Sequence, residues 1–331
     1  MSGHQGKQHQ HHLHPTPPEI AALHERITAE LQPLLASRNV DAITVREICQ
    51  RYLTVPTEAS GKDAKPASSP RPSSDAEDDI MAPSFAGAGP STSEDSKRPA
   101  HVSRTHINLP VLSVALRPRV WRVLLGTHNK DDSSLDNWTP QFDLDNQKII
   151  RGDCDRTRPG QEEFEADNGR LRDELEVLLT FYCRSRGVVY KQGLNEIVAP
   201  FLVAFEGFSR GQILNCCYAL IAKFLPSIFN DNEFESLQCI MRLFNLLLLY
   251  HDPVLANYLS QYLIEPEMYA TPWFITLFAR KSPLPVVFAL WDLYIIEDDP
   301  FLPYFVALAL LIRNRKFLLQ VRTICFLQLA V

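Results

Sequence analysis

The stretch Leu171-Arg-Asp-Glu-Leu-Glu-Val-Leu-Leu-Thr-Phe-Tyr-Cys-Arg-Ser-Arg186 decides the fold class of this chain. Its residues Leu175, Leu178, Leu179 and Tyr182 recur every three or four positions, which is the spacing of one face of an α-helix. The same spacing recurs through the C-terminal two thirds of the chain, and strand-like alternation is absent there over any useful length. The sequence therefore predicts an all-α domain of many helices.

Turn residues separate the other segments with helical spacing. Besides 171–186, helices are expected at 112–125 (interrupted by Pro118), 198–205, 212–224, 235–250, 254–261, 273–278, 285–294 and 301–312. The longest apolar runs fall short of the roughly 18 to 20 residues that span a bilayer, so we expect buried helices and no transmembrane segment.

Composition excludes several classes of function. The formal net charge of −6 argues against binding to nucleic acid, which favours a basic surface. The seven cysteines are odd in number and show no metal-ligand spacing, which predicts a reduced, cytosolic protein without a metal site. The histidine cluster at positions 9, 11, 12 and 14 could capture a metal, but such tracts are typical of unstructured tails.

The chain divides into four parts by composition. Residues 1–17 are predicted to be a disordered tail, and residues 54–104, rich in Pro, Ser and acidic side chains, a disordered linker. Between them, residues 18–53 form a short helical segment of two helices, the second beginning at a Thr44 capping box. This hairpin either binds a partner or, as we favour, folds back on the main domain. The main domain is predicted to cover residues 105–331.

Three polar motifs interrupt the helical pattern. Arg117-Pro-Arg-Val-Trp121 opens a helix, and its tryptophan is expected to anchor the core. The charged run 150–159 is expected to be a loop, whose exposed arginines could reach a phosphate in another molecule. Composition alone favours a solvated loop with local ion pairs.

The third motif is Tyr190-Lys-Gln-Gly-Leu-Asn-Glu196. Gln192 carries both a donor and an acceptor and can orient a water molecule, Gly193 permits a tight backbone, and Asn195 can cap a helix. Without further context the motif is typical of a turn at a helix start.

Together the three motifs resemble the fingerprint of TBC-domain Rab GTPase-activating proteins, which reads R-x-x-x-W, then I-x-x-D-x-x-R, then Y-x-Q. The resemblance extends over roughly residues 109–319 and includes Thr157 and Pro159, Gly193 and Asn195, and the Pro272-Trp273 and Trp291-Asp292 pairs. The matching positions of the fingerprint are Arg117 and Trp121, then Ile150, Asp153 and Arg156, then Tyr190 and Gln192.

The resemblance implies a role for each matching residue. Arg156 and Gln192 would be the catalytic arginine and glutamine fingers, offered to a Rab-family GTPase that itself holds GTP and Mg²⁺, so this chain needs no cofactor. Asp153 would hold its loop or orient Arg156, Tyr190 would support Gln192, and Thr157 and Asn195 would be further supporting residues. The structural positions would be Arg117, Trp121, Trp273, Trp291 and Asp292, with the tryptophans as core anchors and Asp292 as a helix-local acceptor.

Other interpretations stay open. The segment 178–186 resembles a TBC subfamily that bridges golgin-coated vesicles to endosomal sorting machinery and lacks the fingers, so a non-catalytic scaffold for Rab or vesicle-tethering partners is the alternative. A generic helical interaction domain is a third. By the same resemblance we expect a cytoplasmic protein, peripheral on Golgi or endosomal membranes. Family domains usually continue further, so the C-terminal end at Val331 is expected to be shortened or incomplete. Deletion of residues 1–100 is expected to preserve most GTPase activation.

Overall fold

The computed structural model describes residues 18–37, 39–54, 112–130, 132–165, 169–231 and 234–320. The predicted tail at 1–17 and all but the first residue of the predicted linker at 54–104 lie outside the described residues. Within the described ranges the regular elements are helices, so the predicted all-α fold class is confirmed.

The helices follow one another with short connections. They are α1 (Pro18–Leu35), α2 (Ala42–Thr54), α3 (Arg117–Leu124), α4 (Ser133–Asp136), α5 (Gln147–Asp155), α6 (Glu162–Glu165), α7 (Arg170–Arg186), α8 (Leu194–Ala204), α9 (Arg210–Phe224), α10 (Glu235–His251), α11 (Pro253–Gln261), α12 (Pro266–Tyr269), α13 (Thr271–Ile275), α14 (Leu284–Glu297), α15 (Leu302–Arg313) and α16 (Arg315–Leu318).

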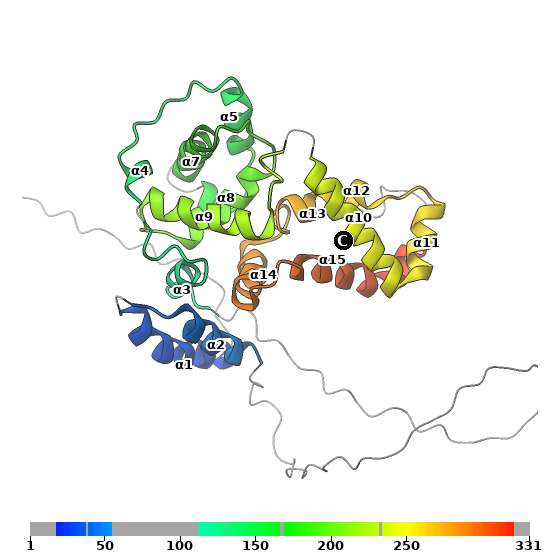
Figure 1. The fold of residues 1–331 in the computed structure, drawn as a ribbon, viewed down its shortest axis with the longest axis horizontal. Coiled ribbons are helices and arrows are strands. Elements are labelled where there is room, and N and C mark those ends of the chain that lie inside the picture. Colours follow the sequence, from blue (N-terminus) through cyan, green and yellow to red (C-terminus); the bar gives the residue numbers. More distant parts are fainter. Residues whose placement is uncertain are drawn as a thin grey trace, which may run out of the picture.

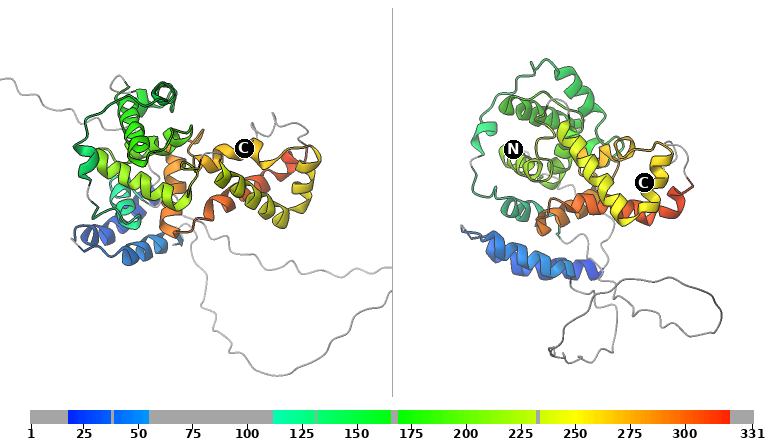
Figure 2. Two further views of the ribbon diagram at one scale, coloured as in Figure 1. Left: turned by 45° about the horizontal axis from the view of Figure 1, so that its top comes forward. Right: turned by 45° about the vertical axis from the view of Figure 1, so that its right-hand side comes forward.

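The helices gather in two halves (Figure 1). In the first half α7 packs against α5, α8 and α9, and in the second α10 packs against α11, α12, α13 and α15. Helix α14 lies between the halves and contacts α2, α3 and α8, and the rotated views keep this arrangement (Figure 2). Gly193, directly before α8, lies against Ile275 of α13, so the start of α8 lies where the two halves meet.

Some helix boundaries differ from the prediction for local reasons. Pro118 stands in the first turn of α3, where its missing N–H costs nothing, so it begins the helix rather than interrupting it. Helix α5 extends through residue 155, so much of the predicted charged loop at 150–159 is helical. Helix α13 ends at Ile275 because Leu277 and Phe278 adopt positive φ angles of 47° and 65°.

A buried ion pair fastens α3 to α14. The Arg117 guanidinium donates to both carboxylate oxygens of Asp292, with Nε 3.0 Å from Oδ1 and Nη2 3.0 Å from Oδ2. Trp121 Nε1 donates to Asp292 Oδ1 at 2.8 Å, and the Trp121 ring packs on Trp291 and Phe201. The prediction that Asp292 serves a helix-local bond is wrong, because its partners belong to another helix.

The three predicted tryptophan anchors are not equivalent. Trp121 and Trp291 are fully buried, and Trp291 Nε1 donates to Leu277 O at 3.0 Å. Trp273 is only half-buried and packs its ring between Tyr269 and Phe278 at the edge of the core. Position 273 is therefore a peripheral packing residue rather than a central anchor.

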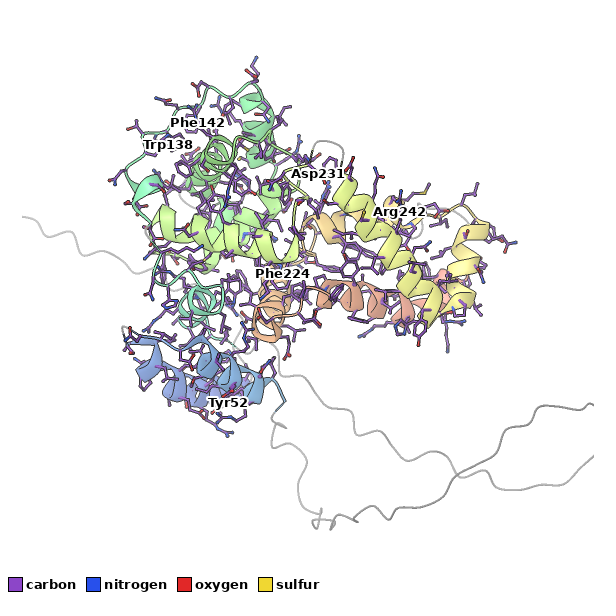
Figure 3. All side chains as sticks on the ribbon, viewed as in Figure 1. Tyr52, Trp138, Phe142, Phe224, Asp231 and Arg242 are labelled. Carbon is purple, nitrogen blue, oxygen red and sulfur yellow. The ribbon has the colours of Figure 1, made fainter. Side chains whose placement is uncertain are left out.

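The N-terminal hairpin of α1 and α2 folds back on the domain. Helix α2 packs against α3 and α14, and its Arg46 Nη1 donates to the carbonyls of Ile295 and Ile296 at 2.9 and 2.7 Å. These carbonyls lie in the last turn of α14, where a cation also interacts favourably with the helix dipole. The pair of helices, with Tyr52 on α2, lies below α3 in Figure 3.

The start of α2 differs from the predicted capping box. The helix begins at Ala42, and the Asp41 carboxylate accepts hydrogen bonds from the backbone N–H groups of Ile43 and Thr44, both at 3.1 Å. Asp41 therefore caps this helix, and Thr44 lies inside its first turn. An aspartate satisfies these N–H groups and suits the positive end of the helix dipole.

Candidate functional site

Helix α5 positions two of the fingerprint residues. It packs on α7 and buries Ile150 and Cys154, so Asp153 on the same side of the helix is also inside the domain. Arg156 follows the last residue of α5, and its φ of −100° and ψ of 5° lie outside the helical range. Its side chain is 63% exposed, whereas that of Asp153 is 0% exposed. One end of α5 thus presents a cation outward and keeps a carboxylate inside.

The buried Asp153 carboxylate joins two segments of the chain. Its Oδ1 pairs with Arg156 Nη2, and its Oδ2 accepts a hydrogen bond from the Tyr190 hydroxyl at 2.7 Å. Burial and the hydrogen bond to Asp153 raise the pKa of Tyr190, so the phenol stays a proton donor. The carboxylate therefore connects Arg156 to the turn that precedes α8.

A second pair of hydrogen bonds runs parallel to the first. Thr157 Oγ1 donates to Asp153 O at 2.6 Å and accepts from Asn195 Nδ2 at 2.8 Å. Asn195 Oδ1 accepts from the Gly193 N–H at 3.1 Å and lies 3.1 Å from the Tyr190 hydroxyl. Asn195 is inside α8, whose N-cap position is Gly193, so the prediction that Asn195 caps the following helix is wrong.

The four predicted supporting residues thus form one buried network. Tyr190 bonds to Asp153 and lies beside Asn195, and no hydrogen bond from it to Gln192 is present among the described residues. Its support of Gln192 is therefore indirect, through the fixed turn that carries both residues. Lys191 fixes the same turn from the other side by donating to Ile228 O at 3.0 Å.

Gly193 sets how closely this turn approaches the second half of the molecule. Its φ of 111° is rare for residues with a side chain, and a Cβ there would lie 2.4 Å from Ile275 Cγ2 of α13. The absence of a side chain lets the turn pack directly on α13. Gln192, the residue before it, is exposed.

Arg156 and Gln192 line the same cleft, of about 380 Å³. The cleft lies between the end of α5, the turn before α8 and the loop after α13. Its other lining residues are Arg158, Pro159, Gln161, Gly193, Asn195, Glu196, Arg280, Lys281 and Ser282. Four of its charged residues are basic and one is acidic, so the cleft favours an anionic ligand although the whole chain is acidic.

Sequence reasoning gave no role to Arg158, although it holds the far wall of the cleft. Its buried guanidinium donates to Ala279 O at 2.8 Å and to Ser282 O at 3.0 Å, which fixes the loop that carries Arg280 and Lys281. Desolvation lowers the pKa of Arg158, and burial raises the pKa of Glu196 against the opposing effect of Arg158 and Arg280. The one signal in the sequence that could have indicated this role is the position of Arg158 two residues after Arg156.

The remaining predicted residues lie elsewhere. Arg117, Trp121, Trp291 and Asp292 are in the core and do not line the cleft, and Trp273 lies at the core edge. No group of three or more His, Cys, Asp or Glu side chains that could hold a metal ion occurs in the described part of the chain. Within those same ranges, no helix is long and apolar enough to cross a membrane.

Comparison with known proteins defines the class to which this fold and cleft belong. Residues 114–319 match the family model of the Rab-GTPase-TBC domain, which is well over half of the chain. The chain therefore belongs to the Rab-GTPase-TBC domain family, and the predicted resemblance is confirmed.

The characterised proteins that this chain resembles in sequence are longer than the chain. The chain is 28% identical over 214 residues to the TBC domain-containing protein kinase-like protein of Gallus gallus and of Homo sapiens, covering 64% of this chain and 23% of each relative. It is 28% identical over 213 residues to the GTPase-activating protein GYP5 of Saccharomyces cerevisiae, covering 62% of this chain and 22% of that protein. The match thus spans less than a quarter of the length of these relatives.

Two solved structures share the fold. The flagellar RabGAP TBC domain of Chlamydomonas superposes with a TM-score of 0.54 at 22% identity, covering 66% of this chain and 73% of that one. The Ypt/Rab-GAP domain of Gyp1p gives a TM-score of 0.54 at 15% identity, covering 93% of this chain and 91% of that one. At these identities the likeness concerns the fold.

Proposed function

We propose that this chain accelerates GTP hydrolysis by a Rab-family small GTPase, with Arg156 as arginine finger and Gln192 as glutamine finger. The observation that carries the proposal is the cleft that both side chains line, although they are 36 residues apart in the sequence. Both side chains are exposed, while the residues that hold their segments are buried and hydrogen-bonded.

The chemistry of GTP hydrolysis suits these two residue types. The reaction needs an attacking water held in line and a positive charge on the phosphates, and it needs no nucleophile from the activating protein. A guanidinium stays charged and bonds two oxygens at once, while a side-chain amide both donates to and accepts from a water. GTP and Mg²⁺ belong to the partner in this proposal, and the chain contributes no cofactor.

The buried network gives the fingers a fixed starting geometry. The Asp153 carboxylate holds the Arg156 guanidinium by an ion pair in the unbound chain, and that guanidinium still has an exposed surface. Because Asp153 also accepts from Tyr190, the finger and the turn bearing Gln192 are held relative to each other. Such preorganisation lowers the entropy lost when a transition state is bound. Arg280 and Lys281 add positive potential on the opposite wall.

An arginine finger accelerates hydrolysis by roughly 10³- to 10⁵-fold, about 4 to 7 kcal/mol of barrier. The proposal also includes action at the cytoplasmic face of Golgi or endosomal membranes, reached through the Rab itself or vesicle-tethering proteins. The choice of Rab in this proposal depends on surface residues outside the shared motifs.

The test is GTP turnover by a panel of purified, GTP-loaded Rab proteins with and without the chain. We expect strong acceleration on at least one Rab and little on most others. Binding to a Rab without acceleration on any member would favour the rival function, a non-catalytic scaffold. A matched variant carrying Arg242→Ala, on the exposed face of α10, should behave as the parent does.

A further inference from the structure

A second cleft lies where the N-terminal hairpin meets the domain. It has a volume of about 570 Å³, within the range of roughly 300 to 1,000 Å³ usual for sites that bind small molecules. The loop between α1 and α2 forms one wall through Ser37 and Asn39, and α3 with the turn after it forms the other. Its lining residues differ from those of the cleft that holds Arg156 and Gln192.

The charged lining of this junction cleft is basic. Arg119 and Arg122, one turn apart on α3, line it together with His128, and no carboxylate is among its described lining residues. Arg119 makes no hydrogen bond or ion pair with any described residue. Arg122 is ion-paired with Asp132 at 3.4 Å, whereas Arg119 has no ion pair among the described residues, so its charge gives the cleft a local positive potential in a chain with a net charge of −6.

The polar groups at the cleft are also incompletely satisfied. Arg122 Nη2 has three long contacts of 3.4 Å, to Thr127 O, His128 O and Asp132 Oδ2. Arg122 Nε and His128 Nδ1 are buried and have no hydrogen-bond partner among the described residues. Most buried polar groups in folded proteins have a hydrogen-bond partner, so these two nitrogens are available to bond an occupant of the cleft.

The rest of the lining limits the chemistry of that ligand. Asn129 and Asn39 add amides, and Leu35, Val123 and Phe208 add apolar surface. Guanidinium forks match the oxygens of a phosphate, and apolar lining residues accommodate a carbon skeleton rather than a bare ion. We propose that the junction cleft binds a small phosphate ester through Arg119, Arg122 and His128.

Such binding has a structural consequence. Because the cleft is shared by the hairpin loop and α3, an occupant contacts both and stabilises their packing. A ligand that binds only the folded chain raises the unfolding temperature, and the stabilisation grows with the logarithm of the free ligand concentration once that exceeds the Kd. The inference does not depend on the proposed GTPase activation, because it concerns different residues and a different ligand.

The experiment is calorimetric titration of the full chain with inorganic phosphate, glycerol phosphate and inositol trisphosphate, with thermal unfolding measured in parallel. We expect one site, tighter binding of an ester than of inorganic phosphate, and a higher unfolding temperature with the ester. Arg119→Glu should lower the affinity for the ester by about tenfold or more, which is the effect of losing one charge-assisted hydrogen bond. Its unliganded unfolding temperature should match that of the parent, because Arg119 has no hydrogen bond or ion pair to lose among the described residues.

Two control variants locate the site. Arg242→Glu makes the same charge change on α10, in the other half of the molecule (Figure 3), and should bind as the parent does. Arg280→Glu makes it at the finger cleft and should also bind normally. Equal weakening by all three changes would show unspecific attraction and overturn the proposal. Weakening by Arg280→Glu alone, or no binding of any probe by the parent, would overturn it too.

A further arm separates two sources of the same chemistry. Vesicles of phosphatidylcholine with and without a phosphorylated inositol lipid are sedimented with the parent and with Arg119→Glu. Arg119-dependent sedimentation only with the phosphorylated lipid assigns the site to a lipid headgroup. Binding of the soluble ester without vesicle binding assigns it to a soluble metabolite, and both results support the phosphate-ester site.

Discussion

The Tyr190 hydroxyl donates a 2.7 Å hydrogen bond to Asp153 Oδ2. This contact connects the end of α5 to the turn before α8, two segments that each carry one of the proposed fingers. Asp153 Oδ1 pairs with Arg156 at the same time, so one buried carboxylate positions residues on both sides of the cleft.

Tyr190→Phe tests this link while keeping the ring. The change leaves a buried carboxylate oxygen without its donor, and we expect about 1–3 kcal/mol less stability in urea unfolding. GTPase activation should fall at temperatures where the variant is fully folded, since Arg156 shares the same carboxylate. Tyr250→Phe, at a position 82% exposed, is the matched control and should change neither quantity. Unchanged GTPase activation by Tyr190→Phe would show that the buried hydrogen-bond network stabilises the fold without contributing to activation.

Gly193→Ala should be costly for two reasons, a positive φ and the 2.4 Å approach of the new Cβ to Ile275 Cγ2. Gly207→Ala is the matched control, because Gly207 also has a positive φ of 83° but no atom within 4 Å of its added Cβ. The control should lose about 1–3 kcal/mol through backbone strain alone, and Gly193→Ala distinctly more. If both variants lose the same free energy of unfolding in denaturant, α13 moves to accommodate the new methyl group at no further cost.

Asp292→Ala removes one partner of a buried ion pair and leaves the Arg117 guanidinium, 4% exposed, without a counter-charge. We expect a loss of about 3–5 kcal/mol in the free energy of unfolding. Asp143→Ala breaks the pair with Arg184, in which the Asp143 side chain is 65% exposed, and should cost at most about 1 kcal/mol. A loss of similar size in both variants would contradict the structural role of the α3–α14 pair.

The sequence predicted the class of fold and named Arg156 and Gln192, which line one cleft, and its errors have physical causes. Helical spacing identified the long amphipathic helices such as α7 and α10 to within a few residues, because one face of each is buried. It did not reveal the partners of Asp292, because a bond between α3 and α14 joins residues 175 positions apart. Arg158 escaped for the same reason, since its acceptors lie on the loop after α13.

Local chemistry misled the prediction in other places. Thr44 matched a capping box, yet Asp41, three residues earlier, takes the capping role with a charged acceptor. Gly152 and Pro159 indicated a loop over 150–159, but the packing of Ile150 and Cys154 on α7 extends α5 through residue 155. In each case a tertiary or electrostatic interaction outweighed a correct but weaker local preference.

The hairpin changes the expected effect of an N-terminal deletion. Arg46→Ala removes the bonds to the carbonyls of Ile295 and Ile296, and we expect about 1–3 kcal/mol less stability with unchanged turnover per folded molecule. Arg51→Ala, which breaks the exposed pair with Glu30 inside the hairpin, should cost less. Deletion of residues 1–100 should likewise lower the unfolding temperature, since it uncovers α3 and α14, while the protein that stays folded keeps activating. Loss of activation in folded Arg46→Ala would assign the hairpin a role in the Rab surface.

The central claim is that Arg156 and Gln192 act together in one transition state. The most direct test is single-turnover GTP hydrolysis on the Rab most accelerated by the parent, measured with Arg156→Ala, Arg156→Lys, Gln192→Ala and the double alanine variant. Each single variant should fold, bind the GTP-loaded Rab nearly as the parent does, and lose most of an acceleration that is on the order of 10³-fold or more. Lysine should recover little, because an ammonium does not reproduce the planar fork. The double variant should lose little beyond either single one, since residues that act as a unit are not additive. Parent-like turnover by both single alanine variants would contradict the account.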